Sequence, residues 1–127
     1  MNTAVVGIGS NIDPDLNIPR ALELLGSAQE LKAVSKLTAT KPIGFTNQPD
    51  FVNGAALIRT SMNYELFVNY LKDIEKQLGR VREGDKYGPR TIDLDVIIWN
   101  GLIVGNDFFE RRFVRDAVKE LVPEFDE

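Results

Sequence analysis

The sequence of 127 residues contains neither cysteine nor histidine. Without cysteine no disulfide framework can form, so the composition gives no support for secretion. Without histidine, zinc sites of the histidine type and a histidine general base are excluded. No apolar run is long enough to span a membrane, and the N-terminus has no signal-peptide pattern. We therefore expect a cytoplasmic protein with no membrane partner.

Positive charge is also scarce, with 15 Lys and Arg against 19 Asp and Glu and a formal net charge of −4. The broad basic surface typical of nucleic-acid-binding proteins is therefore lacking, and we expect no nucleic-acid partner. The hydrophobic fraction of 43% and the charged fraction of 27% are normal for a globular protein. At this length we expect one domain, residues 1–127, as a monomer or weak oligomer.

Hydrophobic periodicity predicts an alternation of strands and helices. Strands are expected at residues 1–9, 31–40, 51–60, 92–99 and 102–104, and helices at 14–26, at 111–122 and, with either Ser61 or Asn63 as its cap, from 62 or 64 to 78. Up to the 92–99 strand, the order β-α-β-β-α-β is that of a ferredoxin-like split βαβ sandwich in the α+β class. Such a fold has an antiparallel sheet with both helices on one face. Its other face is then free for a functional site.

Asp93 and Asp95 are the strongest candidates for chemistry. Because successive side chains of a strand alternate between its faces, these carboxylates point the same way, with Cα atoms roughly 6.6 Å apart. Ile92, Leu94 and Val96 then face the opposite side. Two like charges at the edge of a core need a compensating cation. Oxygen ligands without histidine or cysteine indicate Mg²⁺, whose coordination substrate phosphates commonly complete.

The segment from Gly79 to Arg90 is glycine-rich and locally basic. Its arginines include Arg80, Arg82 and Arg90, and arginines beside a pair of carboxylates suit phosphoryl transfer, where charge must be neutralised. Two solvated aspartates beside a solvated surface loop would produce a similar pattern. The short distance along the chain between Arg90 and the carboxylate pair favours a functional site.

Four spaced segments carry a family resemblance. They are Gly9-Ser10-Asn11, Gln48-Pro49-Asp50-Phe51-Val52-Asn53, Ile74-Glu75 followed by Gly79-Arg80-Val81-Arg82, and Gly88-Pro89-Arg90-Thr91-Ile92-Asp93-Leu94-Asp95. Together they resemble the 6-hydroxymethyl-7,8-dihydropterin pyrophosphokinase family of folate biosynthesis. The resemblance implies a Mg²⁺-dependent enzyme that transfers pyrophosphate from ATP, its co-substrate, to the pterin and releases AMP.

The resemblance also implies a role for individual residues. Asp93 and Asp95 would hold two Mg²⁺ ions and, with Arg80 and Arg90, form the catalytic set. The flat pterin would stack between two aromatic rings. The substrate-binding residues would be Thr40, Pro42, Ile43, Phe51, Asn53, Tyr87 and Phe113, and the nucleotide-binding residues would be Lys72, Arg82, Val96 and Arg111.

Some positions depart from the family pattern. Between Asn106 and Arg111 the chain lacks the family's tract with a Pro-His pair, and Lys72 stands where glutamine is common. Either Arg111 or Arg112 matches the arginine that precedes Phe113. These departures leave open a pterin- or nucleotide-binding homologue with weakened or absent catalysis. An RNA-binding module on the same fold is a further alternative, which the acidic composition disfavours.

Overall fold

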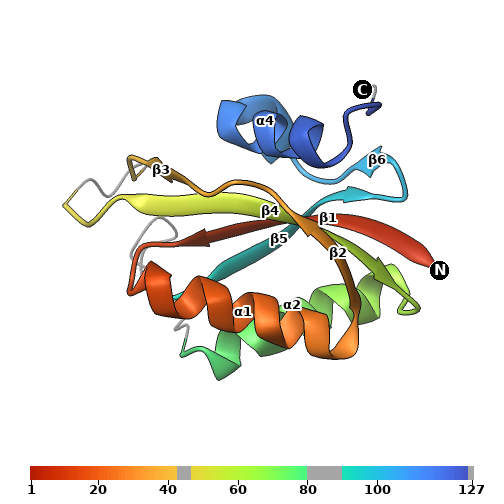
Figure 1. Ribbon diagram of the computed structural model, residues 1–127, viewed down its shortest axis with the longest axis horizontal. Coiled ribbons are helices and arrows are strands. Elements are labelled where there is room, and N and C mark those ends of the chain that lie inside the picture. Colours follow the sequence, from red (N-terminus) through yellow and green to blue (C-terminus); the bar gives the residue numbers. More distant parts are fainter. Residues whose placement is uncertain (43–46, 80–89, 126–127) are drawn as a thin grey trace.

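The computed structural model describes residues 1–42, 47–79 and 90–125. In this part of the chain a six-stranded antiparallel sheet lies between helices (Figure 1). The elements are β1 (Asn2–Ser10), α1 (Pro14–Ala28), β2 (Glu30–Val34), β3 (Thr38–Thr40), β4 (Phe51–Thr60), α2 (Tyr64–Gln77), β5 (Asp93–Trp99), β6 (Leu102–Ile103), α3 (Asp107–Glu110) and α4 (Arg112–Leu121). The strand order is β2-β4-β1-β5-β6, and β3 also pairs with β4. This arrangement confirms the expected ferredoxin-like α+β fold.

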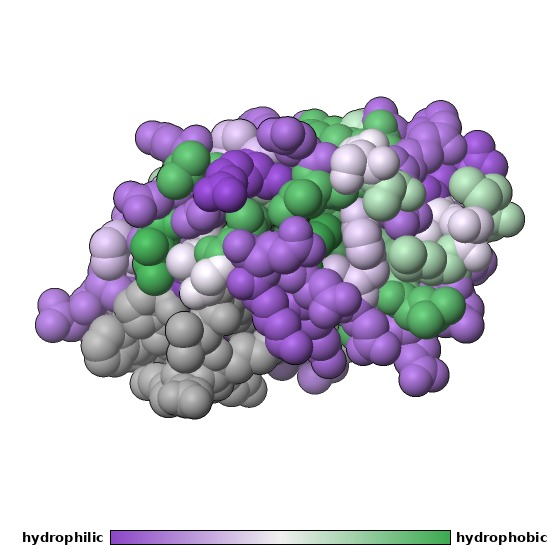
Figure 2. All heavy atoms as spheres, turned by 90° about the horizontal axis from the view of Figure 1, so that it is seen from below, coloured by the Kyte–Doolittle hydropathy of each residue, from purple (hydrophilic) through white to green (hydrophobic). Residues whose placement is uncertain are grey.

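Helices α1 and α2 cover one face of the sheet, as the sequence predicts (Figure 1). The larger core lies between them and the sheet, because the alternating apolar residues of the central strands face this side. Its strand members include Ala4, Val6, Ile8, Leu94 and Val96. The outer surface of this layer is mainly hydrophilic, with hydrophobic side chains showing between the polar ones (Figure 2). Exposed apolar side chains that are scattered in this way are normal for a globular protein.

Helix α4 packs against the opposite face (Figure 1). A second core lies beneath it, in which Val5 and Ile97 from the sheet meet Phe108, Ala117 and Val118 from the C-terminal segment. The face opposite α1 and α2 is therefore only partly free. The uncovered part is where a site can form.

The predicted helix boundaries agree closely with the structure. Asn63 caps α2, because its Oδ1 accepts a hydrogen bond of 2.9 Å from the main-chain N–H of Leu66. Helix α1 begins at Pro14 as expected but continues through Gly26 to Ala28. Among the described residues, no helix is long and apolar enough to cross a membrane.

The expectation of one strand over residues 31–40 is wrong, because the chain forms β2 and β3 with a break between them. At the break the Ser35 N–H donates to the Ala55 carbonyl, and Ser35 Oγ accepts from the Ala55 N–H, both at 2.9 Å. The Lys36 N–H then bonds to the Glu120 side chain of α4 at 3.0 Å. The strand is interrupted because its next main-chain donor is bonded to a distant helix.

The C-terminal segment matches the prediction in part. The helix expected over residues 111–122 is α4, whereas the short helix α3 before it was not anticipated. The expected turn at Asn100 and Gly101 is present, and both residues have positive φ angles, 50° and 81°. Such a pair of left-handed residues is typical of a tight turn between antiparallel strands.

Gly26 offers a test of these helix boundaries. The Gly26→Ala substitution should raise the free energy of unfolding by about 0.5–1 kcal/mol, because alanine loses less backbone entropy in a helix. A methyl group there would meet only Leu31, at an ordinary distance of 3.8 Å. Gly101→Ala should instead lower it by about 1–2 kcal/mol, since Gly101 is left-handed. Urea unfolding measures the free energy of unfolding of both variants. Equal effects of the two substitutions would contradict the placement of Gly26 within α1 and of Gly101 in a left-handed turn.

Candidate active site

A cavity of about 230 Å³ opens on the α4 side of the sheet. Residues from β1, β3, β4, β5 and the segment 107–114 line it. The predicted site residues that line it are Thr40, Phe51, Asn53, Arg90, Asp93, Asp95, Arg111 and Phe113. Lining residues that were not anticipated include Gly7, Gly9, Lys41, Asp107 and Val114. The structure thus gathers in one place residues that lie far apart in the sequence.

Two glycines of β1 leave room above the middle of the sheet. In the strand register Gly7 pairs with Asp95 and Gly9 pairs with Asp93. A Cβ atom on Gly9 would lie 2.9 Å from the side-chain oxygen of Asn53, which is too close without movement. Glycines at positions i and i+2 of a strand lie on the same face, and this pattern is a sequence signal for the cavity.

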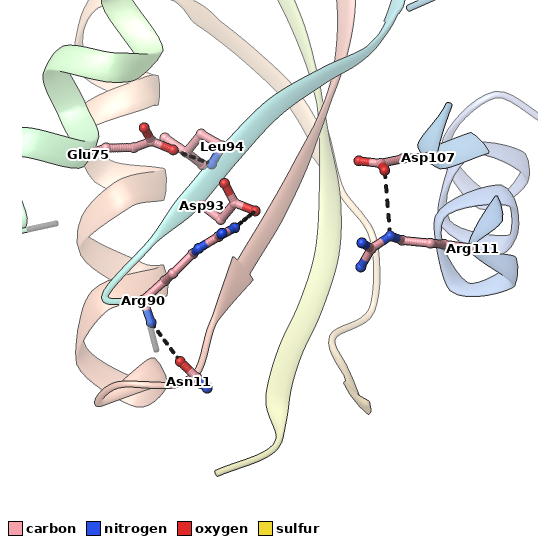
Figure 3. Close-up of polar contacts among 7 residues, drawn as sticks. All are labelled: Asn11, Glu75, Arg90, Asp93, Leu94, Asp107 and Arg111. Carbon is pink, nitrogen blue, oxygen red and sulfur yellow. Dashed lines mark hydrogen bonds and ion pairs between the residues drawn. The ribbon is translucent and has the colours of Figure 1, made fainter. Parts of the chain in front are cut away.

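The carboxylates of Asp93 and Asp95 both line the cavity, whereas the Leu94 side chain between them lies in the opposite core. This is the alternation expected from the strand. Nη1 of Arg90 lies 3.3 Å from a carboxylate oxygen of Asp93, and both side chains are partly buried (Figure 3). The ion pair fixes one cation beside the carboxylate pair.

The carboxyl group of Asp95 is electrostatically unusual. It is exposed to the cavity, yet the surrounding protein removes part of its hydration, and this raises its pKa from 3.8 to about 7. The negative charge of Asp93 and a hydrogen bond to Asp93 act in the same direction, followed by the charges of Glu75 and Asp107. Asp95 therefore tends to keep its proton up to near neutral pH when no cation is bound.

Asn11 holds the segment that carries Arg90. The Asn11 Oδ1 accepts a hydrogen bond of 2.8 Å from the Arg90 N–H (Figure 3), and the Asn11 N–H donates to the Arg90 carbonyl at 3.1 Å. Its side-chain amide donates to Gln48 and to the Pro49 carbonyl, at 2.7 and 3.0 Å. The buried Asn11 therefore joins the two segments that lead into β4 and β5.

Polar and aromatic groups from β3 and β4 form another part of the wall. The side-chain amide of Asn53 donates to the Thr40 hydroxyl, and Thr40 pairs with Phe51 across the strands. Phe113 reaches the same cavity from α4. Two aromatic rings and an oriented amide therefore share one cavity.

Two arginines were candidates for the position before Phe113, and the structure separates them. Arg111 lines the cavity, where its Nε lies 3.5 Å from the Asp107 carboxylate (Figure 3). Arg112 lies on the outer surface with its side chain 86% exposed, beside Asp116. Arg111 is therefore the arginine that can reach a ligand in the cavity.

Some predicted residues do not reach the cavity. The Val96 side chain is buried in the core on the other face of the sheet, Lys72 is exposed on α2, and Pro42 does not line the cavity although Thr40 and Lys41 do. The remaining predicted residues, Ile43, Arg80, Arg82 and Tyr87, lie outside the described residues.

The carboxylate pair suits a hard divalent cation. Within the described ranges, no group of three or more His, Cys, Asp or Glu side chains could hold a metal ion. Mg²⁺ commonly uses one or two carboxylates together with substrate phosphates, which agrees with Asp93 and Asp95. The pKa of Asp95 is raised first by lost hydration and then by nearby negative charge, and a bound divalent cation would favour the ionised carboxylate against both. The donor set therefore fits Mg²⁺.

Residues 5–123 match the family model described as 7,8-dihydro-6-hydroxymethylpterin-pyrophosphokinase. The chain is 36% identical over 131 residues to the 2-amino-4-hydroxy-6-hydroxymethyldihydropteridine pyrophosphokinase of Bacillus subtilis, which covers 94% of this chain and 78% of that protein. The namesake from Methylorubrum extorquens is 36% identical over 128 residues, covering 97% and 80%. A folate synthesis bifunctional protein of Arabidopsis thaliana is 34% identical, covering 93% of this chain and 26% of that protein.

The raised pKa of Asp95 predicts a pH-dependent stability difference between the wild type and Asp95→Asn. Between pH 4 and pH 7 the folded state retains a proton that the unfolded state releases, so this group lowers stability as the pH rises toward about 7. Asp95→Asn should therefore be more stable at pH 8, with a gain that shrinks toward pH 4. Thermal unfolding without divalent cations measures it. Asp116→Asn, at an exposed site on α4, should give a nearly constant difference. A gain from Asp95→Asn that grows toward acid pH would contradict this prediction.

Proposed function

The chain belongs to the 7,8-dihydro-6-hydroxymethylpterin-pyrophosphokinase family, and on this premise we propose that it transfers pyrophosphate from ATP to 6-hydroxymethyl-7,8-dihydropterin in folate biosynthesis. The observation that carries the proposal is a single cavity lined by a carboxylate pair and two aromatic side chains, those of Asp93, Asp95, Phe51 and Phe113. Carboxylates suit a phosphate-bound cation, and aromatic faces suit a flat heterocycle.

The pterin would bind at the end of the cavity formed by β3, β4 and α4. Phe51 and Phe113 would supply stacking faces for the ring. Asn53 would hydrogen-bond the polar edge of the pterin, and its bond to Thr40 fixes the orientation of the amide beforehand. A side chain that is already oriented loses less entropy when the ligand binds.

The phosphates of ATP would bind at the end of the cavity formed by β5 and residues 107–111. Asp93 and Asp95 would hold two Mg²⁺ ions, which supply charge neutralisation for the phosphate oxygens. Arg90 and Arg111 line the same region, and both already contact carboxylates, at 3.3 and 3.5 Å. We propose that they engage phosphate oxygens, with Arg80 and Arg82 assisting from the neighbouring segment.

In the reaction the pterin hydroxyl oxygen attacks the β-phosphorus of ATP. The new bond joins that oxygen to the β-phosphorus, and the bond from the β-phosphorus to the oxygen shared with the α-phosphorus breaks. AMP leaves with this oxygen, and the hydroxyl proton passes to solvent. The chain has no histidine, so catalysis would depend on the alignment of the reactants and on positive charge from Arg90 and its neighbours.

A pterin-binding homologue with slow turnover is the second candidate. The observation that favours it concerns the nucleotide, since neither Lys72 nor Val96 lines the cavity. Among the described residues assigned to the nucleotide, Arg111 alone does so. Weak ATP binding with normal pterin binding would identify this second case.

AMP formation tests the proposed reaction directly. The wild type should release AMP from ATP only when both the dihydropterin and Mg²⁺ are present, and a chelator should stop the reaction. Asp95→Ala should lower the rate at least about 100-fold, the scale of losing one preorganised charge at a reacting phosphate. Asp116→Asn, on the outer surface of α4, should retain the wild-type rate. Absence of AMP from the wild type at saturating ligand concentrations would overturn the proposed reaction.

The position of Gly9 tests the pterin end of the cavity. Gly9→Ala should weaken pterin binding about tenfold, the equivalent of one hydrogen bond, because the added methyl group must displace the Asn53 side chain. Gly26→Ala, on the exposed side of α1, is the matched control and should leave the affinity unchanged. Calorimetric titration with the pterin measures both variants after thermal unfolding has shown that they are folded. Unchanged affinity for Gly9→Ala would place the pterin elsewhere.

A further inference from the structure

Glu75 of α2 is a charged residue with almost no solvent contact. The residue is 1% exposed, and its Oε2 accepts a hydrogen bond of 2.8 Å from the main-chain N–H of Leu94 (Figure 3). Burial of a carboxylate is costly unless hydrogen bonds compensate it. The partner of Glu75 is of particular interest because Leu94 separates Asp93 from Asp95.

The location of this bond follows from the position of β5 near the sheet edge. On one side β5 pairs with β1 along most of its length. On its other side, within the described residues, β6 pairs only with Ile98 and Trp99. The first half of β5 therefore takes an acceptor for the Leu94 N–H from α2. A buried main-chain donor without any acceptor would be strongly unfavourable.

Leu94 is consequently held at two points. Its side chain is 4% exposed within the core beneath α1 and α2, and its N–H is bonded to Glu75. The carboxylates of Asp93 and Asp95 extend from the adjacent residues to the opposite face. Any rotation of the strand at Leu94 would therefore change the separation and direction of both carboxylates.

We propose that Glu75 is a positioning residue that holds Asp93 and Asp95 in the arrangement needed to bind Mg²⁺ with ATP. This inference rests on the proposed function, since it concerns the same metal site. Glu75 acts mainly through its hydrogen bond to the main chain of β5, its charge is only a lesser contribution at Asp95, and it does not line the cavity. It is thus a part of the site that lies on the other side of the sheet.

Two substitutions separate the hydrogen bond from the charge. Glu75→Gln keeps the side-chain length and an acceptor oxygen but removes the charge. Glu75→Asp keeps the charge but is one carbon shorter and cannot reach Leu94 from the same helix position. Glu75→Met, which is apolar and of similar length, loses both. Ile74→Val, at a neighbouring buried position of α2, controls for a general loss of stability.

The measurement is the Mg²⁺ concentration that half-saturates ATP binding, determined by calorimetry. Glu75→Asp and Glu75→Met should raise it at least about tenfold, the scale of losing a residue that orients metal ligands. Glu75→Gln and Ile74→Val should stay within about twofold of the wild type. Pterin affinity without Mg²⁺ should be the same in all four, because its proposed contacts lie on β3, β4 and α4.

The Leu94 amide provides a readout that does not depend on activity. Its proton should exchange slowly with solvent in the wild type and in Glu75→Gln, and faster in Glu75→Asp and Glu75→Met. NMR of the folded proteins measures this, and Glu75→Met serves if Glu75→Asp does not fold.

The outcomes distinguish the inference from the function on which it rests. An unchanged Mg²⁺ requirement in a folded Glu75→Asp or Glu75→Met protein would overturn the positioning role while leaving the proposed function intact. A Glu75→Gln protein as impaired as Glu75→Asp would show that the charge matters instead of the bond, which also overturns it. A wild type without Mg²⁺-dependent ATP binding would overturn the proposed function and this inference together.

Discussion

The arrangement of the cavity depends on the hydrogen bonds made by the buried side chain of Asn11. Its oxygen accepts from the Arg90 N–H, and its amide donates to Gln48 and Pro49. One side chain thus fixes the ends of two strands that enter the sheet on either side of β1. Because Arg90 is held in this way, its guanidinium can contact Asp93, three residues further along the chain. The segment that carries Asn11 therefore supports a cationic side chain that lies 79 positions further along the chain.

The sequence predicted those features of the site that depend on local periodicity. Strand alternation alone was enough to place Asp93 and Asp95 on one face and Leu94 on the other, and the structure agrees. The break at Ser35 could not be predicted in this way, because Lys36 bonds to Glu120, a residue 84 positions away. The same holds for Glu75, whose partner becomes evident only when α2 lies across β5. Interactions between distant segments are therefore the main reason why the structure differs from what the sequence predicts.

Several residues in and around the cavity show where a family resemblance or a sequence pattern differs from the chain's own geometry. Val96 was assigned to the nucleotide by resemblance, yet strand alternation turns its side chain into the opposite core. Asp107 carries no sequence signal of its own, and its place beside Arg111 depends on the short helix α3. The glycines of β1 were visible in the sequence, but their significance required the register that pairs them with the carboxylates.

The lining of the cavity extends along the chain from Gly7 to Val114. The central strand β1 therefore needs both of its neighbours, β4 and β5, to be in place. The last helix, α4, supplies the remaining wall of the cavity. Pairings between such distant segments form slowly, since a long loop must close before each contact is gained. Recovery of ligand binding after dilution from denaturant thus requires all of these pairings to have formed. The binding site is, in effect, an internal indicator that the whole topology has been completed.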